Sequence, residues 1–278
     1  MQLSQVGLAV DFHSHSIASH HAQNSIDEML RAAASRGLVA VALTDHSPGL
    51  DNTIYLLAAR LQQADLQADL ERVQAPDKHY FHTLLSRYAP PPEIKLKLFK
   101  GIECNILGPV TTGRSEWIDV PPGLEGQLDL VIASIHEFEH LFDAGREDVN
   151  AVLQQVVGQA ALDIVGHPYS RRYQVDYVAL ARVAATAGVA LEVNNSYLRY
   201  KRIETDVIRS LLAAARQADC QISVSSDAHA AAEIGFHQEV LELIRAMDFP
   251  PELIVNRSLE SALEFCNSRR QLRQSRVC

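Results

Sequence analysis

Short apolar runs recur along the chain, and most are followed by a segment whose apolar residues have helical spacing. Continuous runs rich in Val, Ile and Leu are typical of strands that are buried on both faces of a parallel sheet. We predict seven such strands, over residues 6–12, 38–44, 94–102, 128–135, 162–166, 189–193 and 221–226. Strands that alternate with helices indicate an α/β fold, either a barrel or a doubly wound sheet.

The segments between the strands carry signals for the start and the end of helices. Ser25-Ile26-Asp27-Glu28 fits a capping box, and Gly37 stands where the cap at the end of that helix is expected. The same kind of signal predicts a helix from Asp176 to Gly188 and another over residues 205–219, opening with Thr205. The helices therefore fall between consecutive strands, as β/α units require.

One connection is much longer than the others. Residues 51–93 stand between the second and third strands, where a compact domain usually needs only a short link. We interpret them as a helical insertion, with helices at about 54–72 and 77–88, that either packs on the barrel wall or covers the active site. The end of the chain, 269–278, has little apolar content and is expected to be frayed. We expect one domain over residues 1–278.

Composition narrows the class of protein. The chain has 278 residues, 47% of them hydrophobic, and can bury a core without a structural metal, so any metal is expected to be catalytic. A net charge of -9 without a basic tail argues against a dedicated duplex-binding protein. The four cysteines show no metal-finger spacing and indicate reduced thiols of a cytoplasmic protein. We find neither a signal peptide nor a membrane-length apolar run.

Potential metal ligands, or their polar neighbours, stand at the carboxyl end of every predicted strand. In chain order these are Asp11, His13 and His15; Asp45 and His46; Glu103; His136; His167; Glu192, Asn194 and Asn195; and Asp227 and His229. A spacing of two residues puts both members of a pair on one face of a strand. Converging imidazoles and carboxylates suit hard or borderline divalent metals. In a β/α barrel this end of the strands carries the active site.

Such a cluster favours phosphoryl transfer. Divalent cations lower the pKa of a bound water and neutralise charge on phosphoryl oxygens. No Ser-His or Cys-His nucleophile stands at these strand ends. We expect in-line attack by a metal-bridging hydroxide on a phosphate monoester. Arg171, Arg172 and Arg199 follow the fifth and sixth strands and could contact the phosphate. A metal-bound water or Asp45 could act as the general acid.

The motifs DFHSHS, LTDHSPG, KGIECN, ASIHE, VGHPYS, LEVNNS and SSDAH, taken in this order, resemble the polymerase and histidinol phosphatase (PHP) family. The resemblance runs from residue 8 to about 265 and is greatest to small, single-domain bacterial phosphatases of the YcdX type. It implies a distorted (β/α)7 barrel, similar to a TIM barrel, that holds three divalent ions of zinc, manganese or iron.

The resemblance also implies how the ligands divide among the ions. The first ion would be held by His13, His15 and Asp227, with Glu103 as a bridge; the second by Glu103, His136 and His167; and the third by His21, His46 and His229. His21 is chosen over His20 because the second histidine of that run aligns with the family's single one. The residues expected to orient the ligands are Asp11, Asp45, Glu192, Asn194 and Asn195. The expected catalytic residues are Glu103, Asp45 and Asp227.

Three other functions compete with a phosphatase acting on small phosphorylated metabolites. A PHP-type exonuclease or phosphodiesterase would act on nucleic acid, which the acidic net charge disfavours. A barrel amidohydrolase also opens with H-x-H, but it typically has a carboxylated lysine or an acid at the fourth strand, where this chain has His136. A non-catalytic binding module would not need a complete ligand set. The sequence predicts no membrane partner and leaves the oligomeric state open.

Overall fold

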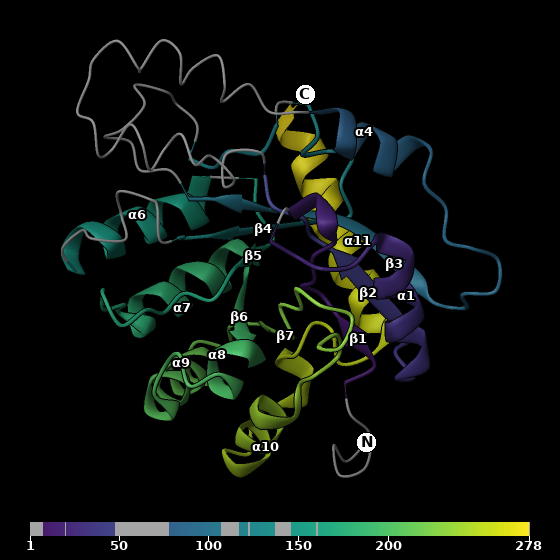
Figure 1. Ribbon diagram of the computed structural model, residues 1–278. Helices are drawn as coiled ribbons and strands as arrows, with labels where there is room; N and C mark the ends of the chain where they lie inside the picture. Colours follow the sequence, from purple (N-terminus) through teal and green to yellow (C-terminus); the bar gives the residue numbers. More distant parts are fainter. Residues whose placement is uncertain are drawn as a thin grey trace, which may run out of the picture.

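The computed structural model describes residues 8–19, 21–47, 78–106, 117–121, 123–136, 146–159 and 161–277. Seven parallel strands lie in one sheet in chain order (Figure 1). They are β1 (Val10–Asp11), β2 (Ala40–Leu43), β3 (Lys97–Asn105), β4 (Leu130–Ser134), β5 (Ile164–Val165), β6 (Ala190–Asn194) and β7 (Ile222–Ser225). A parallel bridge between Ser14 and Ala228 joins the residues that follow β1 and β7. The sheet therefore curls into a nearly closed barrel, and the predicted distorted (β/α)7 fold is confirmed.

Helices lie around this sheet (Figure 1). They are α1 (Ile26–Ser35), α4 (Lys78–Ser86), α6 (Arg146–Gln159), α7 (Tyr177–Ala187), α8 (Asn195–Arg199), α9 (Thr205–Gln217), α10 (Gln238–Ala246) and α11 (Leu259–Val277), with 3-10 turns η1 (Ile17–Ser19) and η3 (Pro251–Leu253). Helices α1, α4, α6, α7, α8 and α9 stand between consecutive strands, and α10 and α11 follow β7. Within the described ranges, none of the helices combines the length and apolar character needed to cross a membrane.

The predicted helix signals are present as local hydrogen bonds and backbone angles. Ser25 and Glu28 form the reciprocal capping box of α1, and Gly37 follows that helix with a φ of 78°. The Asp176 side chain accepts a hydrogen bond from the first turn of α7, and Gly188 ends α7 in the left-handed region. Only glycine enters that region without a steric cost from Cβ. These caps fix where each chain segment leaves the helix layer and enters the sheet.

The second predicted helix of the 51–93 insertion is present as α4. Its Phe81 and Leu84 are buried, so this helix packs on the body of the domain. The first predicted helix, at about 54–72, lies outside the described residues.

An apolar layer fills the inside of the barrel below the strand ends. Phe12 and Phe99 meet edge to face with ring centroids 5.5 Å apart, and Phe265 of α11 closes this layer from beneath. Ile132 and Ile164 complete it from the far side of the barrel. The polar residues at the carboxyl ends of the strands therefore stand on a dry floor, which keeps water from entering from below.

The prediction of a frayed chain end is wrong. Helix α11 continues to Val277, and Arg269 and Arg273 on it are buried against Asp163. The two guanidinium groups also donate to main-chain carbonyls around the amino ends of the strands, including Leu162 O at 2.6 Å. A low apolar content misled the prediction, because the last turns of this helix dock through charge-assisted hydrogen bonds rather than through apolar side chains.

We predict that Arg273→Ala lowers the free energy of unfolding by about 3–5 kcal/mol, because it leaves the buried Asp163 carboxylate short of a partner. Arg270→Ala is the matched control on the same helix. Its partner Asp129 lies in a half-exposed pair, and its loss should cost no more than about 1 kcal/mol. Urea unfolding of both variants measures the difference. Equal destabilisation of the two variants would show that burial gives the Arg273–Asp163 pair no larger contribution to the free energy of unfolding than an exposed pair has.

Candidate metal centre

Glu103 of β3 lies at the centre of a group of imidazoles that come from neighbouring strands. Its Oε2 atom is 3.1 Å from His13 Nε2 and 3.0 Å from His46 Nδ1. Its Oε1 atom is 3.2 Å from His136 Nε2 and 3.1 Å from His167 Nε2. These histidines follow β1, β2, β4 and β5, so the carboxyl ends of five strands meet at one carboxylate.

Asp227 provides a second carboxylate beside the first. Its Oδ1 atom is 3.2 Å from His15 Nε2 and 3.5 Å from His13 Nε2. Asn194 Nδ2 donates to the other oxygen at 3.0 Å. Asp227 has a φ of 51°, an uncommon conformation for any residue except glycine and asparagine or aspartate. This bend turns the chain after β7 so that Asp227 and His229 both face the group.

His21 completes the set from the loop that follows β1. Its ring stacks 4.6 Å from the ring of His229 and 5.0 Å from that of His46. His15 stacks 4.3 Å from both of those rings. The structure thus brings together every residue that the sequence predicted as a metal ligand.

Among the described residues, three groups of donors are compact enough to hold an ion. The donor atoms within each group lie within 4.8 Å of one another, and the groups are His13, His15 and Glu103; His46, Glu103 and His136; and His15, His46 and His229. These groups overlap the predicted ligand sets of the three ions but do not match them throughout. His46 is also grouped with Glu103, and His15 is also grouped with His46 and His229.

Each of five histidines is held at Nδ1, on the side away from the centre. The partners are Glu192 Oε1 for His13 (2.6 Å), Ser19 Oγ for His15 (3.1 Å), Asn105 Oδ1 for His136 (2.7 Å), Tyr197 OH for His167 (3.4 Å) and the Asp227 carbonyl for His229 (3.0 Å). A carboxylate, carbonyl or amide oxygen only accepts. The Ser19 hydroxyl donates to Asp45 at 2.6 Å and so accepts from His15. In neutral rings of His13, His15, His136 and His229 these partners place the proton on Nδ1 and leave the Nε2 lone pair free for a metal. The Tyr197 hydroxyl can either donate to His167 or accept from it.

Several nitrogens that face the centre are buried and have no hydrogen bond of good geometry in the described part of the chain. They are Nε2 of His13, His15 and His229, and Nδ1 of His46. Each buried polar atom left unpaired costs about 1–3 kcal/mol, and a divalent cation would provide the missing partner. Nitrogen and carboxylate donors without thiolate suit zinc, manganese or iron. The residues present therefore fit the metals that the sequence implied.

The charges at the centre stabilise one another. Burial alone would raise the pKa of Glu103, but His13, His136 and His46 hold it well below its usual range. The pKa of Asp227 is held well below its usual range in the same way, against burial, by the neighbouring rings of His13 and His15. Burial lowers the pKa of His15 well below its ordinary value and that of His46 to about 4. At neutral pH both carboxylates are ionised and both of these imidazoles are neutral, which is the state that binds a metal.

Comparison with known proteins identifies the family. The PHP domain model matches residues 11–196, which is more than half of the chain. The chain belongs to the PHP domain family.

Its relatives agree with this assignment, and a solved structure shares the fold. A probable phosphatase of Edwardsiella ictaluri is 32% identical over 262 residues, covering 94% of this chain and 95% of the relative. The probable phosphatase YcdX of Escherichia coli is 31% identical over 261 residues, with 94% of each chain covered. A histidinol phosphate phosphatase from Lactococcus lactis, solved with zinc, L-histidinol and phosphate, has a TM-score of 0.53 and 18% identity, covering 87% of this chain and 95% of that one. The likeness to the Lactococcus lactis structure concerns the fold alone. The relatives confirm the predicted resemblance to YcdX-type proteins.

The residues expected to orient the ligands of this PHP domain occupy different positions around them. Glu192 contacts His13 Nδ1 and accepts the His167 backbone N–H at 2.7 Å. The carboxylate of Asp11 accepts from the Ser226 and Gly235 backbone N–H groups, so it closes the barrel between β1 and β7. The side chain of Asn195 instead holds the start of α10, donating to Glu239 at 2.7 Å and accepting from Val240 N at 2.9 Å.

Asp45 lies one step behind the imidazoles. Its carboxylate accepts from Ser16 N at 2.7 Å, from both the Ser16 and Ser19 hydroxyl groups, and from the Tyr80 hydroxyl of α4. The carboxylate therefore reaches His15 through Ser19. Tyr80 brings the insertion into the same network.

Sequence reasoning missed several polar residues next to the ligands. Ser134 donates to Glu103 Oε1 at 2.6 Å, and Gly166 is needed beside it because a Cβ there would lie 2.0 Å from Ser134 Oγ. Asn105 and Ser134 each stand two residues from a predicted ligand, so the strand period could have identified them. Ser19 and Tyr197 come from a 3-10 turn and a short helix, where no such spacing applies.

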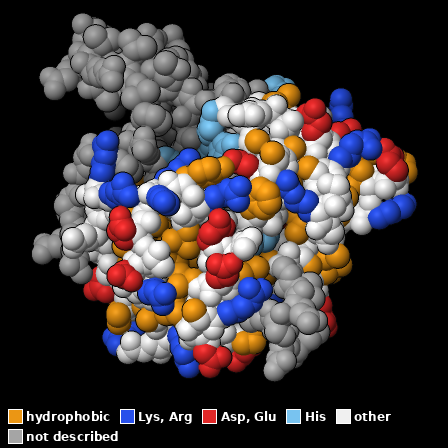
Figure 2. Space-filling model, turned by 60° about the horizontal axis from the view of Figure 1, so that its bottom comes forward, with side chains coloured by type: hydrophobic (Ala, Val, Ile, Leu, Met, Phe, Trp, Pro, Cys, Tyr) orange, Lys and Arg blue, Asp and Glu red, His pale blue; other side chains and the backbone are white. Residues whose placement is uncertain are grey.

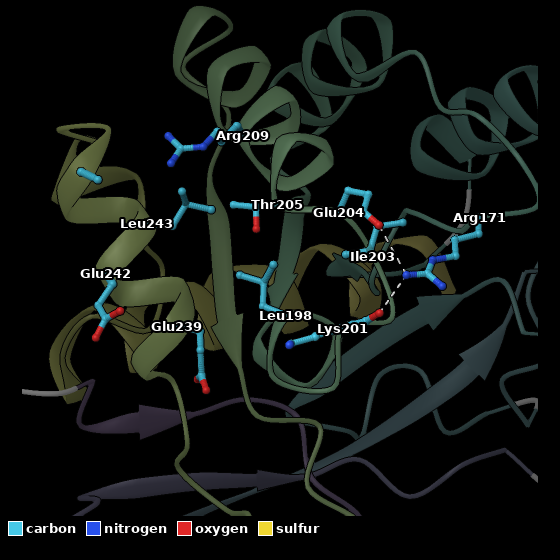
Figure 3. Close-up of a pocket in the computed structure, with 11 residues that line it drawn as sticks. Arg171, Leu198, Lys201, Ile203, Glu204, Thr205, Arg209, Glu239, Glu242 and Leu243 are labelled. Atoms are coloured by element: carbon cyan, nitrogen blue, oxygen red, sulfur yellow. Dashed lines mark hydrogen bonds and ion pairs between the residues drawn. The ribbon is translucent and has the colours of Figure 1, made fainter.

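The predicted phosphate-binding arginines have other partners in the structure. Arg171 Nη2 donates to the Lys201 carbonyl at 2.9 Å and pairs with Glu204 (Figure 3). Arg171 also lines a cavity of about 690 Å³ bordered by α8, α9 and α10. Arg199 lies over the Phe236 ring, 4.3 Å from its centroid. For Arg172 the structure gives a backbone N–H bond to Ser170 Oγ. A contact between these arginines and a substrate stays a prediction.

We predict that Ser19→Ala weakens zinc binding about tenfold, the range found when a residue behind a ligand is lost. The change removes the acceptor for His15 Nδ1 and for the His46 backbone N–H. Competition with a chromophoric chelator measures the affinity. Ser210→Ala, which removes only a bond to the Asp206 carbonyl on exposed α9, is the control. Equal zinc affinity in both variants would contradict the role of Ser19.

Proposed function

We propose that this PHP-family protein is a metal-dependent phosphoesterase that hydrolyses small phosphate monoesters at a site for three divalent ions. The observation that carries the proposal is the set of buried, unpaired ring nitrogens around two ionised carboxylates, Glu103 and Asp227. Full-length relatives named as probable phosphatases support the reaction class. The zinc and phosphate bound by the Lactococcus lactis protein of the same fold agree with it.

The proposed ligands are those of the sequence analysis. The first ion would bind His13, His15 and Asp227, with Glu103 as the bridge; the second Glu103, His136 and His167; and the third His21, His46 and His229. Ions held there would supply a hydroxide near neutral pH and positive charge for the phosphoryl oxygens. The chain itself keeps both carboxylates ionised, holds the ring protons on Nδ1, and supports the site from below with an apolar layer.

The roles of Asp45 and of the insertion follow from the hydrogen bonds around Asp45. Burial raises the pKa of this carboxyl group, while four donors surround it. We propose that Asp45 positions Ser19 and, through it, His15, instead of donating a proton to the leaving group. Because Tyr80 of α4 is one of the donors, part of the insertion belongs to the wall of the site.

Charge distribution favours a small substrate over a nucleic-acid strand. A strand needs a continuous positive groove along its backbone. On the face shown in Figure 2, basic and acidic side chains are interspersed next to a group of histidines. Arg171 and Arg199 are each within 4.0 Å of a carboxylate, of Glu204 and of Glu239. A single phosphate group could displace one such partner, so Arg171, Arg172 and Arg199 remain the proposed substrate contacts.

The thiols agree with the cytoplasmic location that we propose. Cys104, Cys220 and Cys266 are free and buried, as in proteins of a reducing compartment.

We predict that the purified protein releases phosphate from small monoesters and that exhaustive chelation abolishes this activity. Zinc or manganese should restore it, because the unpaired nitrogens require a cation. The measurement is kcat/KM over sugar, nucleotide and histidinol phosphates, with metal analysis of the same preparation. Release of mononucleotides from single-stranded DNA at the same salt concentration is the comparison. Full activity without metal would end the proposal, and a faster reaction on DNA would replace the monoesterase with a nuclease.

We predict that Glu103→Ala lowers kcat/KM more than His21→Ala does, on the order of a hundredfold or more against about tenfold. Glu103 faces five imidazoles, so its loss leaves several donors without the central anion. His21 lies in a loop, and its neighbours His46 and His229 could still hold an ion. Metal content is measured beside activity for each variant. An inactive His21→Ala together with a near-normal Glu103→Ala would refute the bridging role.

A further inference from the structure

Asp119 lies outside every motif of the sequence analysis, yet its carboxylate joins two strand ends of the metal centre. Its Oδ1 atom accepts the Asn105 backbone N–H at 2.6 Å. Its Oδ2 atom accepts from Asn105 Nδ2 at 2.6 Å and from the Ser47 hydroxyl at 2.8 Å. Asn105 ends β3 two residues after Glu103, and Ser47 directly follows His46. One side chain therefore holds the segments that carry two of the proposed ligands.

The chemistry of these contacts allows only one arrangement of protons. An ionised carboxylate only accepts, so the NH2 group of the Asn105 amide must face Asp119. The amide oxygen then faces the other way, where it lies 2.7 Å from His136 Nδ1. Because this oxygen also only accepts, the His136 proton must be on Nδ1. The lone pair of Nε2 is then directed at Glu103, whose Oε1 atom is 3.2 Å away.

The same carboxylate supports the other two members of this donor group. Ser47, held at its hydroxyl by Asp119, donates its backbone N–H to the Glu103 carbonyl at 2.7 Å. A parallel bridge pairs His46 with Glu103 at the same point. His46, Glu103 and His136 are one of the compact donor groups of the centre, and all of them depend on contacts that converge on Asp119.

We propose that Asp119 is a positioning residue for this donor group, and that it sets the tautomer of His136 by fixing the orientation of the Asn105 amide. The inference rests on the proposed metal site, but it concerns metal binding and ring tautomer rather than the substrate. The arrangement at His136 differs from that at His13, where the carboxylate of Glu192 contacts the ring directly. At His136 the anion acts through an amide, so the ring is oriented without a second full charge beside it.

The test uses Asp119→Asn in the full-length protein loaded with zinc. An amide at position 119 brings its own N–H donors, so it no longer forces the Asn105 amide into one orientation. Zinc affinity of the weakest-bound ion should fall about 10–100-fold, and dialysis against a zinc buffer should then remove one ion per chain. In two-bond ¹H–¹⁵N spectra of the imidazoles, the His136 signal of the Nδ1–H tautomer should be lost or become mixed.

A charge-conserving exchange provides the rescue. In the double variant Asn105→Asp with Asp119→Asn, the carboxylate at 105 accepts from His136 Nδ1, and the amide at 119 donates to that carboxylate. The order of donors and acceptors from position 119 through 105 to His136 is restored, while the Ser47 hydroxyl turns to accept from the new amide, so zinc affinity and the Nδ1–H signal should return toward those of the natural chain. A residue that only fills space would not be rescued by exchanging the two groups.

Two further variants keep the test decisive. Asp129→Asn makes the same change before β4, at the other end of the barrel, where the carboxylate accepts the Lys100 backbone N–H; zinc binding should be unchanged. Asn105→Ala keeps the backbone bond to Asp119 but removes the acceptor for His136, and should lose the same ion even if Asp119→Asn fails to fold.

Unchanged zinc affinity and tautomer in Asp119→Asn or Asn105→Ala would overturn the proposal, as would a double variant no better than Asp119→Asn. Because none of these readouts uses a substrate, they stay valid if the phosphoesterase activity is not found. A natural chain that binds no zinc would instead refute the metal site itself.

Discussion

The structure depends on holding two carboxylates and several imidazoles in one buried space with their lone pairs directed inward. Such groups lose hydration when they are buried, and an unpaired one costs free energy. In this chain Glu103 and Asp227 remain ionised because the imidazoles around them offset the effect of burial on their pKa. Among the residues that the structure describes, four ring nitrogens that face the centre still lack a hydrogen bond. The fold therefore retains an unfavourable arrangement that bound cations would relieve.

The barrel makes this arrangement possible because its strands are parallel and follow one another around the sheet. Carboxyl ends that are consecutive in the chain become neighbours in space, so each strand can contribute a ligand without a long connection. Below them, Phe12 and Phe99 form an apolar floor, and Phe265 of α11 closes it. The same helix is locked to the amino end of the barrel by Arg269 and Arg273 around Asp163. Rigidity at one end thus supports precise placement at the other.

Much of this could be predicted from the sequence, and the exceptions have physical causes. Apolar runs marked all seven strands, and a spacing of two marked pairs such as His13 and His15, because both signals are local. The contact of Asp119 with Asn105 is not local in this sense. The sequence pattern around either residue would look the same whether or not the two residues were in contact. The docking of α11 through buried arginines was missed because apolar periodicity does not register charged side chains that are buried. The division of ligands among ions was implied by family resemblance, and the geometry groups His46 and His15 more broadly.

The partners of the imidazoles differ in chemistry, and this gives the ligands different properties. Glu192 places a full negative charge beside His13. Burial alone would lower the pKa of that ring, but the carboxylates of Glu103, Glu192 and Asp227 raise it well above its ordinary value. Ser19 offers His15 only a hydroxyl group. Burial and the neighbouring rings of His46 and His229 lower the pKa of His15 well below its ordinary value. A more basic imidazole donates more strongly to a metal. Neighbouring ligands of one centre are thus unequal donors, and the inequality comes both from groups that face the centre and from residues behind it such as Glu192.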